Sequence, residues 1–265
     1  MARGPALSVS GWPFFHIDAF AEAPFSGNPA AVVLLEEWLD DTLLQRIAAE
    51  INLPATTFCV PAGGEADFEV RWFAPQAEIG LCGHGTLAAG HALIGERQSI
   101  RFATRNAGVI AVAQADRLYS LALPALPTEP RALPKSVAAL GGEPLETFWH
   151  DRGYALIRYA NEAAIRALKP DFAALATLGD IQHSATAPGD TTDIVSRVFN
   201  RRGEDAVTGS AHALLTPYWA ERLGRPAFSA LQASARGGHL SCRLEGEQAV
   251  LGGRCVTVAE GTLTV

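Results

Sequence analysis

The sequence predicts an α+β fold made of two similar halves, and three observations lead to this prediction. Short segments of alternating polar and apolar residues, typical of half-buried strands, recur along the chain between Gly and Pro residues. Segments with helical periodicity separate these strands. A proline-rich stretch lies near the middle of the chain, and the residues on its two sides share a weak repeat.

Periodicity places the individual elements. Strands are expected at residues 14–20, 68–73, 99–104, 109–113 and 117–123. Helices are expected at residues 41–51, 85–93, 161–168, 172–178 and 211–223. Residues 124–130 hold three prolines, which remove backbone donors and restrict φ. We therefore expect an N-terminal domain at residues 1–123 and a C-terminal domain at residues 131–255, and residues 256–265 could complete the last strand of the first domain.

The weak repeat has an interval of 126 residues. The same residue types recur at this interval: Arg71, Phe73, Glu78 and Gly83 are matched by Arg197, Phe199, Glu204 and Gly209. In the same register Cys82 corresponds to Thr208, and His84 corresponds to Ser210. Chance can produce such a short match. The alternative is a duplicated unit, whose equivalent loops would face each other and frame one cleft.

Composition and charge argue against several classes of function. The 265 residues carry a formal net charge of -7 and no run of Lys and Arg, which disfavours a nucleic-acid or anionic-membrane surface. None of the four cysteines has a zinc-ligand spacing. The first ten residues lack the features of a signal peptide, and no apolar stretch is long enough to span a membrane. We expect a cytoplasmic protein with reduced thiols.

Two small-residue turns, at residues 81–90 and 207–215, each run into a helix. The start of a helix leaves free N–H groups and a partial positive charge. Two such starts that converge would hold a carboxylate without any arginine. The alternative interpretation is ordinary capping, in which Thr208 or Ser210 only begins a helix.

Glu50 is the candidate acid/base residue. It lies in the last turn of the helix expected at residues 41–51 and at the edge of its apolar stripe, seven residues after Leu43. The helix dipole and partial burial would both raise the pKa of Glu50, toward the value that a proton shuttle needs. The alternative is a solvated glutamate on the surface.

Other chemistries compete with a glutamate shuttle. Cys82 and His84 could form an activated thiolate, although residues two apart seldom point toward each other. A metal site at these two residues lacks further ligands at a useful spacing. Ser210, His212 and Asp205 are the residue types of a hydrolytic triad, but they are crowded together and no G-x-S-x-G turn is present. Asp205 could also be an acid near a helix start, or an acceptor for a substrate amine or hydroxyl. No nucleotide-binding glycine motif occurs.

Several blocks resemble the phenazine-biosynthesis PhzF-like isomerase family. They occur in the family's order and span nearly the whole chain: Asp18-Ala-Phe20, Gly27-Asn-Pro-Ala-Ala-Val32, Ala49-Glu-Ile-Asn-Leu53, Arg71-Trp-Phe-Ala-Pro75, Glu78-Ile-Gly-Leu-Cys-Gly-His84, Glu204-Asp-Ala-Val-Thr-Gly-Ser210 and Ala233-Ser-Ala-Arg-Gly-Gly238. Each block alone is a weak signal, whereas the set is a specific one.

The resemblance implies a diaminopimelate-epimerase-like fold. In this fold two pseudo-symmetric domains each form a curled, mostly antiparallel sheet around a central helix, with the site between them. It also implies a homodimer that uses neither metal nor organic cofactor. The family's glutamate, which shuttles a proton between two substrate carbons, corresponds to Glu50. The matching cleft residues are Gly83, His84, Asp205, Gly209 and Ser210.

The chain departs from the family's pattern in its second half. The loop between Phe199 and Glu204 is about three residues shorter than usual, Ala206 replaces a common proline, and residues 128–190 are compact. Because racemases of this fold use two facing cysteines, the pairing of Cys82 with Thr208 excludes a symmetrical two-thiol mechanism.

The sequence therefore predicts a cofactor-independent isomerase that acts on a small carboxylate. Glu50, His84 and Asp205 are its predicted catalytic residues. The predicted binding residues are Gly83, Gly209, Ser210 and Cys82. Two alternatives remain open: an epimerase that uses Glu50 with Cys82, and a binding protein that retains the cleft without the chemistry.

Overall fold

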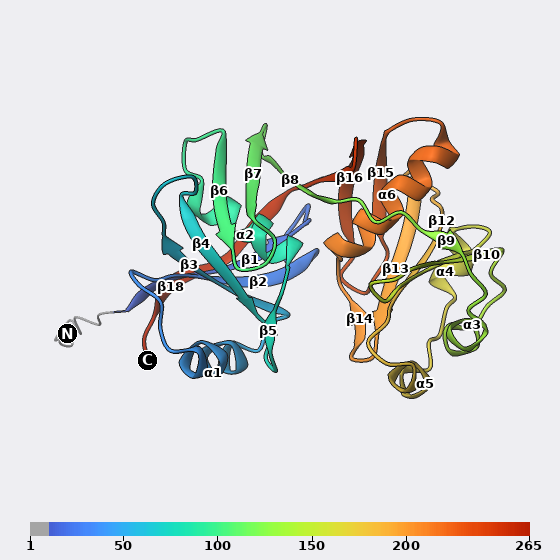
Figure 1. Ribbon diagram of the computed structural model, residues 1–265, viewed down its shortest axis with the longest axis horizontal. Helices are drawn as coiled ribbons and strands as arrows, with labels where there is room; N and C mark the ends of the chain where they lie inside the picture. The colour runs from blue at the N-terminus through green and yellow to red at the C-terminus, as the bar shows by residue number, and fades with distance from the viewer. Residues whose placement is uncertain (1–10) are drawn as a thin grey trace, which may run out of the picture.

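The computed structural model describes residues 11–265, which form two halves that lie side by side (Figure 1). The first half contains β1 (Trp12–Ala19), β2 (Asn28–Leu34), α1 (Asp41–Ile51), β3 (Ala55–Pro61), β4 (Phe68–Phe73), β5 (Glu78–Ile79), α2 (Gly83–Leu93), β6 (Ser99–Thr104), β7 (Val109–Ala115) and β8 (Leu118–Pro124). The second contains β9 (Glu129–Pro130), α3 (Pro134–Leu140), β10 (Glu146–His150), β11 (Tyr154–Arg158), α4 (Glu162–Arg166), α5 (Phe172–Thr177), β12 (Gln182–Pro188), β13 (Ile194–Asn200), β14 (Gly203–Asp205), α6 (Gly209–Leu223), β15 (Ala227–Gln232), β16 (Gly238–Glu245) and β17 (Gln248–Gly253). The last strand, β18 (Cys255–Leu263), returns to the first half, where it pairs with β1.

The two halves have equivalent strand pairings. In the first half, β2 pairs in parallel with β3, and β4 pairs in parallel with β6. In the second half, β11 and β12 form the matching parallel pair, as do β13 and β15. Most other pairings are antiparallel, which agrees with the predicted α+β class.

Strands that cross from one half to the other join the two sheets. β8 and β17 pair antiparallel with each other between the halves. The chain then runs from β8 into β9, which pairs with β10 of the second half, and from β17 into β18, which pairs with β1 of the first half. The pseudo-symmetry of the fold therefore centres on the β8–β17 pair.

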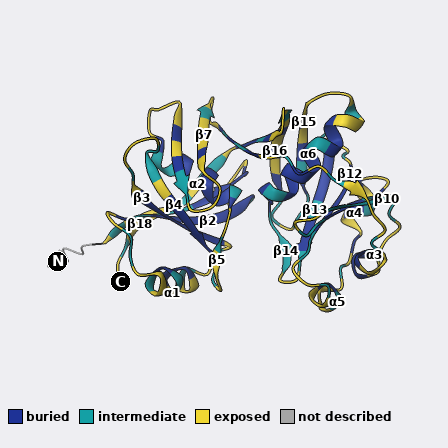
Figure 2. Cartoon of the chain, viewed as in Figure 1, coloured by how far each residue is buried: buried dark blue, intermediate teal, exposed yellow. Residues whose placement is uncertain are grey.

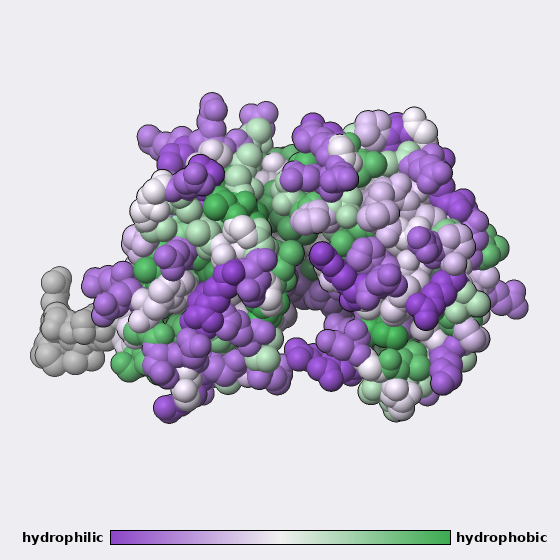
Figure 3. Space-filling view, in the orientation of Figure 1, coloured by the Kyte–Doolittle hydropathy of each residue, from purple (hydrophilic) through white to green (hydrophobic). Residues whose placement is uncertain are grey.

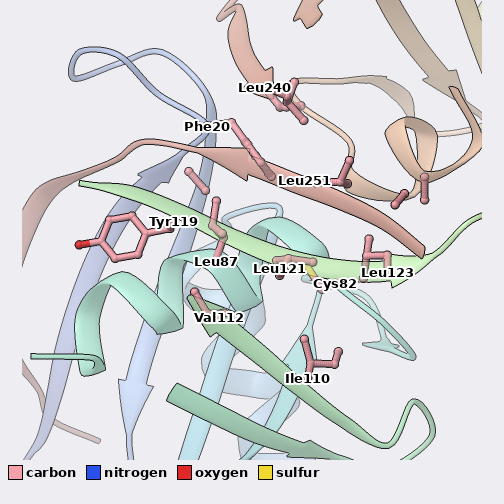
Figure 4. Packing of buried hydrophobic residues seen from close by; sticks show 14 of the residues in the cluster. Phe20, Cys82, Leu87, Ile110, Val112, Tyr119, Leu121, Leu123, Leu240 and Leu251 are labelled. Atoms are coloured by element: carbon pink, nitrogen blue, oxygen red, sulfur yellow. The ribbon is translucent and has the colours of Figure 1, made fainter. Parts of the chain in front are cut away.

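A buried helix occupies the centre of each curled sheet. In α2, seven consecutive residues from His84 to Gly90 are buried, and in α6 most residues are buried (Figure 2). Helices that are apolar on all sides must be enclosed by other elements. The core around them is continuous between the halves: Leu121 and Leu123 of β8 pack near Cys82, and Leu251 extends from the neighbouring β17 (Figure 4).

The predicted element boundaries hold best where periodicity is strong. The helix at residues 41–51 and the strands at residues 68–73 and 99–104 are confirmed without change. The two central helices begin two residues earlier than predicted, at Gly83 and Gly209, because glycines with helical backbone can start a helix despite their low propensity. In the described part of the chain, no helix is both long enough and apolar enough to cross a membrane.

The repeated arginines and glutamates form equivalent bidentate pairs. The Nε and Nη2 atoms of Arg71 both lie 2.8 Å from the Glu78 carboxylate. The same atoms of Arg197 lie 2.8 and 3.0 Å from the Glu204 carboxylate. Each pair fixes the turn between a long strand and the strand that precedes a central helix. The 126-residue repeat is therefore confirmed as a structural duplication.

Removal of one such pair tests its contribution to the fold. Arg71 is only 3% exposed and also binds Asp41 at 2.7 Å, so we expect Arg71→Ala to lower the free energy of unfolding by about 2 kcal/mol. Arg197→Ala is the matched variant in the second half, and its cost should be smaller because Arg197 is 14% exposed. Urea denaturation at neutral pH measures both.

The loss of stability in Arg71→Ala should depend on pH, because Arg71 binds two carboxylates. Hydrogen bonding to Arg71 holds the pKa of Glu78 below its ordinary value of 4.5, and it does the same to the pKa of Asp41. This contribution to stability is present above the unfolded pKa and disappears as the pH falls through the folded pKa. The difference between wild type and Arg71→Ala should therefore shrink in acid. A difference that stays constant down to the acid transition would contradict this account.

Candidate active site

The starts of the two central helices meet between the halves. A methyl group added to Gly83 would lie 3.6 Å from the Cα of Gly209, and one added to Gly209 would lie 3.5 Å from the Cα of Gly83. Leu123 packs against both positions, and Leu251 packs against Gly209, so the apolar core forms the floor below the meeting point. The two turns singled out by the sequence are thus in contact.

Neither helix start is capped by a side chain. Cys82 and Thr208 occupy the N-cap positions of α2 and α6 in extended conformation, and neither makes a side-chain capping hydrogen bond. Thr208 instead donates from its hydroxyl to Asp205 at 2.6 Å. Thr208 therefore begins α6, as the alternative interpretation expected, but its hydroxyl does not cap the helix. In α2 the Gly85 amide is directed at the Cys82 thiol, and the first amides of the two helices face the point where the helices meet.

A cavity of about 410 Å³ opens above these helix starts. Six of the seven predicted site residues line it: Cys82, Gly83, His84, Asp205, Gly209 and Ser210. Apolar residues of the first half, including Ile79, Leu81 and Leu123, and polar residues of the second half, including Gln182, Asn200 and Arg202, also line the cavity. The surface is hollowed between the halves, with hydrophilic residues along the rim (Figure 3). The volume is within the range of cavities that bind small molecules.

Asn28, at the start of β2, connects the two halves within the site. Its Nδ2 atom donates to Asp205 Oδ1 at 2.9 Å and to the Val207 carbonyl at 2.7 Å. The same atom lies 3.5 Å from His84 Nδ1. Asp205 also accepts from Thr208, so each of its oxygens already has one donor. The Asp205 carboxylate is thereby held in one orientation, with lone pairs left for a ligand.

Cys82 and His84 contact each other, contrary to the prediction. The Cys82 Sγ lies 3.5 Å from His84 Nδ1, because the chain changes from extended at Cys82 to helical at Gly83 and folds the imidazole back. Burial raises the pKa of Cys82 to about 12, and burial lowers the pKa of His84 against the opposing effect of Asp205. Both groups are therefore neutral at pH 7, which disfavours an activated thiolate.

The residue types of a hydrolytic triad are present without its contacts. The Ser210 hydroxyl donates to Gln182 Oε1 at 2.9 Å. His212 is buried, and its ring contacts the Thr208 carbonyl at 2.8 Å and the Ser196 hydroxyl at 3.4 Å. Within the described residues His212 makes no hydrogen bond with Ser210 or Asp205, so the site lacks a general base for a serine nucleophile.

Glu50 lies outside the set of residues that line the cavity. The expectation that it is partly buried is wrong, because the buried face of α1 centres on Leu44, Ile47 and Ala48 and leaves Glu50 exposed. The middle of α1 is nevertheless tied to the site. Gln45 donates to the Ala74 and Pro75 carbonyls at 2.9 and 3.1 Å, and Ala74, Pro75 and Pro54 line the cavity. The catalytic role of Glu50 stays a prediction.

Comparison with known proteins identifies the family. Residues 17–261 match the PhzC-PhzF family, described as "Phenazine biosynthesis-like protein". The chain belongs to the PhzC-PhzF family. It is 45% identical to an uncharacterized isomerase of Pseudomonas aeruginosa over 260 residues, which cover 94% of this chain and 97% of the relative.

Solved structures support the same assignment. A PhzF-family protein of Enterococcus faecalis superposes with a TM-score of 0.90 at 38% identity, over 97% of this chain and 100% of that one. A hydroxyproline epimerase of Agrobacterium vitis, at 12% identity and a TM-score of 0.60 over 96% of this chain and 92% of the other, shares the fold. The predicted diaminopimelate-epimerase-like architecture is thus confirmed, and isomerase activity is supported at the level of the PhzF family.

Two polar residues that contact the predicted site residues were not themselves predicted. Asn28 lies in a block that carried the resemblance, but its partner Asp205 is 177 positions away, so no local pattern could assign its role. Gln182 begins β12, and only the fold brings it to Ser210. Across residues 11–265, no group of three or more His, Cys, Asp and Glu side chains could hold a metal ion.

A substitution at Asn28 tests the contact between the halves. Asn28→Asp replaces the donor to Asp205 with a second carboxylate, and two ionised carboxylates at this distance repel each other. The repulsion increases as the pH rises and both groups become ionised, so we expect a cost of about 2 kcal/mol at pH 8 that is smaller at pH 5. Urea denaturation at both pH values measures the difference.

Asn28→Ala is the matched control for this prediction. It removes the same donors without the added charge, so its cost should grow less with pH than the cost of Asn28→Asp. Equal pH dependence in the two variants would refute the electrostatic role of the Asn28–Asp205 contact.

Proposed function

We propose that this chain is a cofactor-independent isomerase that shuttles a proton between carbons of a small carboxylate substrate, with its site in the cleft between the halves. The observation that carries the proposal is the pair of uncapped helix starts that meet at Gly83 and Gly209. Two positive helix ends and their free amides form an anion site that needs no basic side chain.

The substrate carboxylate would lie on the first-turn amides of α2 and α6. This position fixes the substrate over the apolar floor, beside His84 and Asp205. A carboxylate held by oriented N–H groups is also less able to donate charge to the adjacent carbon. Proton removal from that carbon, or from one conjugated with it, is therefore favoured.

Glu50 is the proposed acid/base residue, on the strength of its match to the family's glutamate. It would accept a proton from the activated carbon and return it to a second carbon. His84, which is buried and neutral, would donate a hydrogen bond to developing negative charge. Asp205 would accept a hydrogen bond from a substrate hydroxyl or amine with its remaining lone pairs.

The middle of α1 is bound to the rim of the cavity through Gln45. Pro54, which follows Glu50 by four positions, is a wall residue of the cavity. An exposed glutamate keeps its rotamer freedom, and in this proposal Glu50 would reach the substrate from the open side of the cleft.

The pairing of unlike residues at the helix starts favours a one-base mechanism. Thr208 replaces the second thiol of a racemase, and the Thr208 hydroxyl is already committed to Asp205. A Cys82 thiol with a pKa near 12 cannot exchange its proton readily at neutral pH. The epimerase alternative, with Cys82 as the opposing acid, is the second candidate function.

Glu50→Gln tests the proton shuttle. Because the side chain is exposed, the variant should unfold within about 0.5 kcal/mol of wild type. It should bind ligands found in a thermal-shift screen of small carboxylates as wild type does, and lose proton exchange by more than about a thousandfold. Deuterium incorporation from heavy water, followed by NMR, measures the exchange. Unchanged exchange in the variant would overturn the role of Glu50.

Cys82→Ser separates the two candidate mechanisms. The proposed isomerase should keep most of its deuterium exchange, because the buried Cys82 thiol does not transfer a proton. An epimerase that uses Cys82 as the opposing acid should lose about a thousandfold. If wild type binds the ligands but incorporates no deuterium, the chain is a binding protein instead.

The resemblance to the family also implies a homodimer, and this assembly stays a prediction. Size-exclusion chromatography with light scattering measures it directly. A monomer at the concentrations used for the exchange experiment would remove the dimer from the proposal without affecting the chemistry.

A further inference from the structure

A second cavity adjoins the candidate active site. It has a volume of about 320 Å³ and shares five lining residues with the first cavity: Ala74, Ile79, Gln182, Asn200 and Arg202. Its remaining wall comes from both halves, with Ala77 and Glu78 on one side and Arg152, Tyr154 and Asp180 among those on the other. The two cavities therefore lie next to each other, and a ligand that occupies both would pass these shared residues.

In this second cavity, which we call the outer cavity, the positive and negative charges of the lining residues do not balance. Glu78 is bound in bidentate fashion by Arg71, and Asp180 lies 3.4 Å from Arg201. Arg152 and Arg202 have no carboxylate within salt-bridge distance among residues 11–265. Two guanidinium groups thus remain without a counter-charge at the mouth of the cleft, and each offers a fork of donors that matches a carboxylate or a phosphate.

The turn that carries Arg202 is held in place. Asn200 and Gly203 pair across the hairpin of β13 and β14, which leaves only Arg201 and Arg202 at its tip. The amide N–H of Arg202 donates to the Asn200 side chain at 2.8 Å. The shortened loop that sets this chain apart from the family pattern is therefore the segment that brings Arg202 to both cavities.

Gln182 lines both cavities at their junction. Its Oε1 accepts from Ser210 at the start of α6, while its Nε2 is buried and has no hydrogen-bond partner in residues 11–265. A buried amide donor without a partner is costly unless a ligand satisfies it. The junction thus offers a donor to a polar group in the middle of an elongated ligand.

We propose that the substrate of this enzyme is a dianion. Its second acidic group, a carboxylate or a phosphate, binds to Arg152 and Arg202 in the outer cavity, while its first carboxylate lies on the two helix starts. The inference rests on the proposed function for the position of the first carboxylate. The outer arginines determine which small carboxylates are selected, and they take no part in proton transfer.

Binding of matched probes tests this inference. Isothermal titration calorimetry at low and physiological ionic strength compares glutarate, adipate and pimelate with the monocarboxylates of equal length, and 4-phosphonobutyrate represents the phosphate-like group. We expect the best dianion to bind about tenfold more tightly than its monocarboxylate, because a charge-assisted contact contributes about that factor. The preference should weaken with salt. The ratio of glutarate to 4-phosphonobutyrate affinity identifies the preferred second group.

Single substitutions test whether Arg152 and Arg202 cause the preference for dianions. Arg202→Gln and Arg152→Gln should each reduce dianion affinity by about threefold to tenfold and leave monocarboxylate affinity unchanged, and the double variant should remove the preference. Arg243→Gln is the matched control, since this exposed arginine of β16 lies outside both cavities and its removal changes the net charge equally. It should leave both classes of probe unaffected.

Several outcomes would overturn the dianion proposal. These are equal affinity of wild type for dianions and monocarboxylates, no binding of any dianion, an equal loss for both probe classes in Arg202→Gln, or an equal effect of Arg243→Gln. Failure of the proposed function is a separate result. A chain that prefers dianions but incorporates no deuterium keeps the outer site and loses the isomerase mechanism.

Discussion

The contact between two helix N-termini is the constraint on which the rest of the structure depends. Each helix end carries a partial positive charge, and the starts of α2 and α6 meet at Gly83 and Gly209 with no side chain between them. This arrangement is electrostatically unfavourable unless negative charge is placed nearby. Asp205 supplies part of that charge, held by Asn28 and Thr208, and an anionic substrate supplies the rest. The same feature that costs stability in the free protein therefore generates affinity for a carboxylate.

Duplication explains how the two helix ends come together, and divergence explains why the site is asymmetric. The equivalent pairs Arg71–Glu78 and Arg197–Glu204 fix the turn before each central helix in the same way. The N-cap and first-turn residues then differ: Cys82 and His84 on one side, Thr208 and Ser210 on the other. One side presents a neutral imidazole against a buried thiol, and the other presents hydroxyls linked to Asp205 and Gln182. A symmetrical scaffold thus holds an asymmetric set of hydrogen-bonding groups, which suits a reaction at two different carbons.

The sequence could predict features that depend on local pattern and could not predict those that depend on distant contacts. The helix at α1 and the strands at β4 and β6 follow from periodicity alone. The exposure of Glu50 does not, because a stripe indicates the buried face of α1 without showing how far the neighbouring elements cover its edge. The Cys82–His84 contact was missed because the spacing rule for residues two apart assumes one regular conformation, whereas the backbone changes from strand to helix between them. Asn28 and Gln182 join the site only through contacts with residues 177 and 28 positions away.

The net charge of the protein disfavours an anionic ligand, whereas the charged groups around the cleft favour one. The groups close to the ligand have the larger effect. A protein with a formal net charge of -7 repels anions at long range, yet charges in water are screened beyond about 8 Å at physiological ionic strength. Within that distance of a ligand in the cleft, Glu78 and Glu204 are each neutralised by an arginine in a bidentate pair. The groups that remain for the ligand are the helix ends, the neutral His84 and the cations Arg152 and Arg202. Asp205 keeps free lone pairs beside the helix starts, and Asp180 of the outer cavity is exposed and contacts Arg201. The cleft therefore has positive groups at both ends and the Asp205 carboxylate beside the helix starts, a distribution complementary to a ligand that is anionic at its ends and carries a hydroxyl or an amine near its reacting carbons.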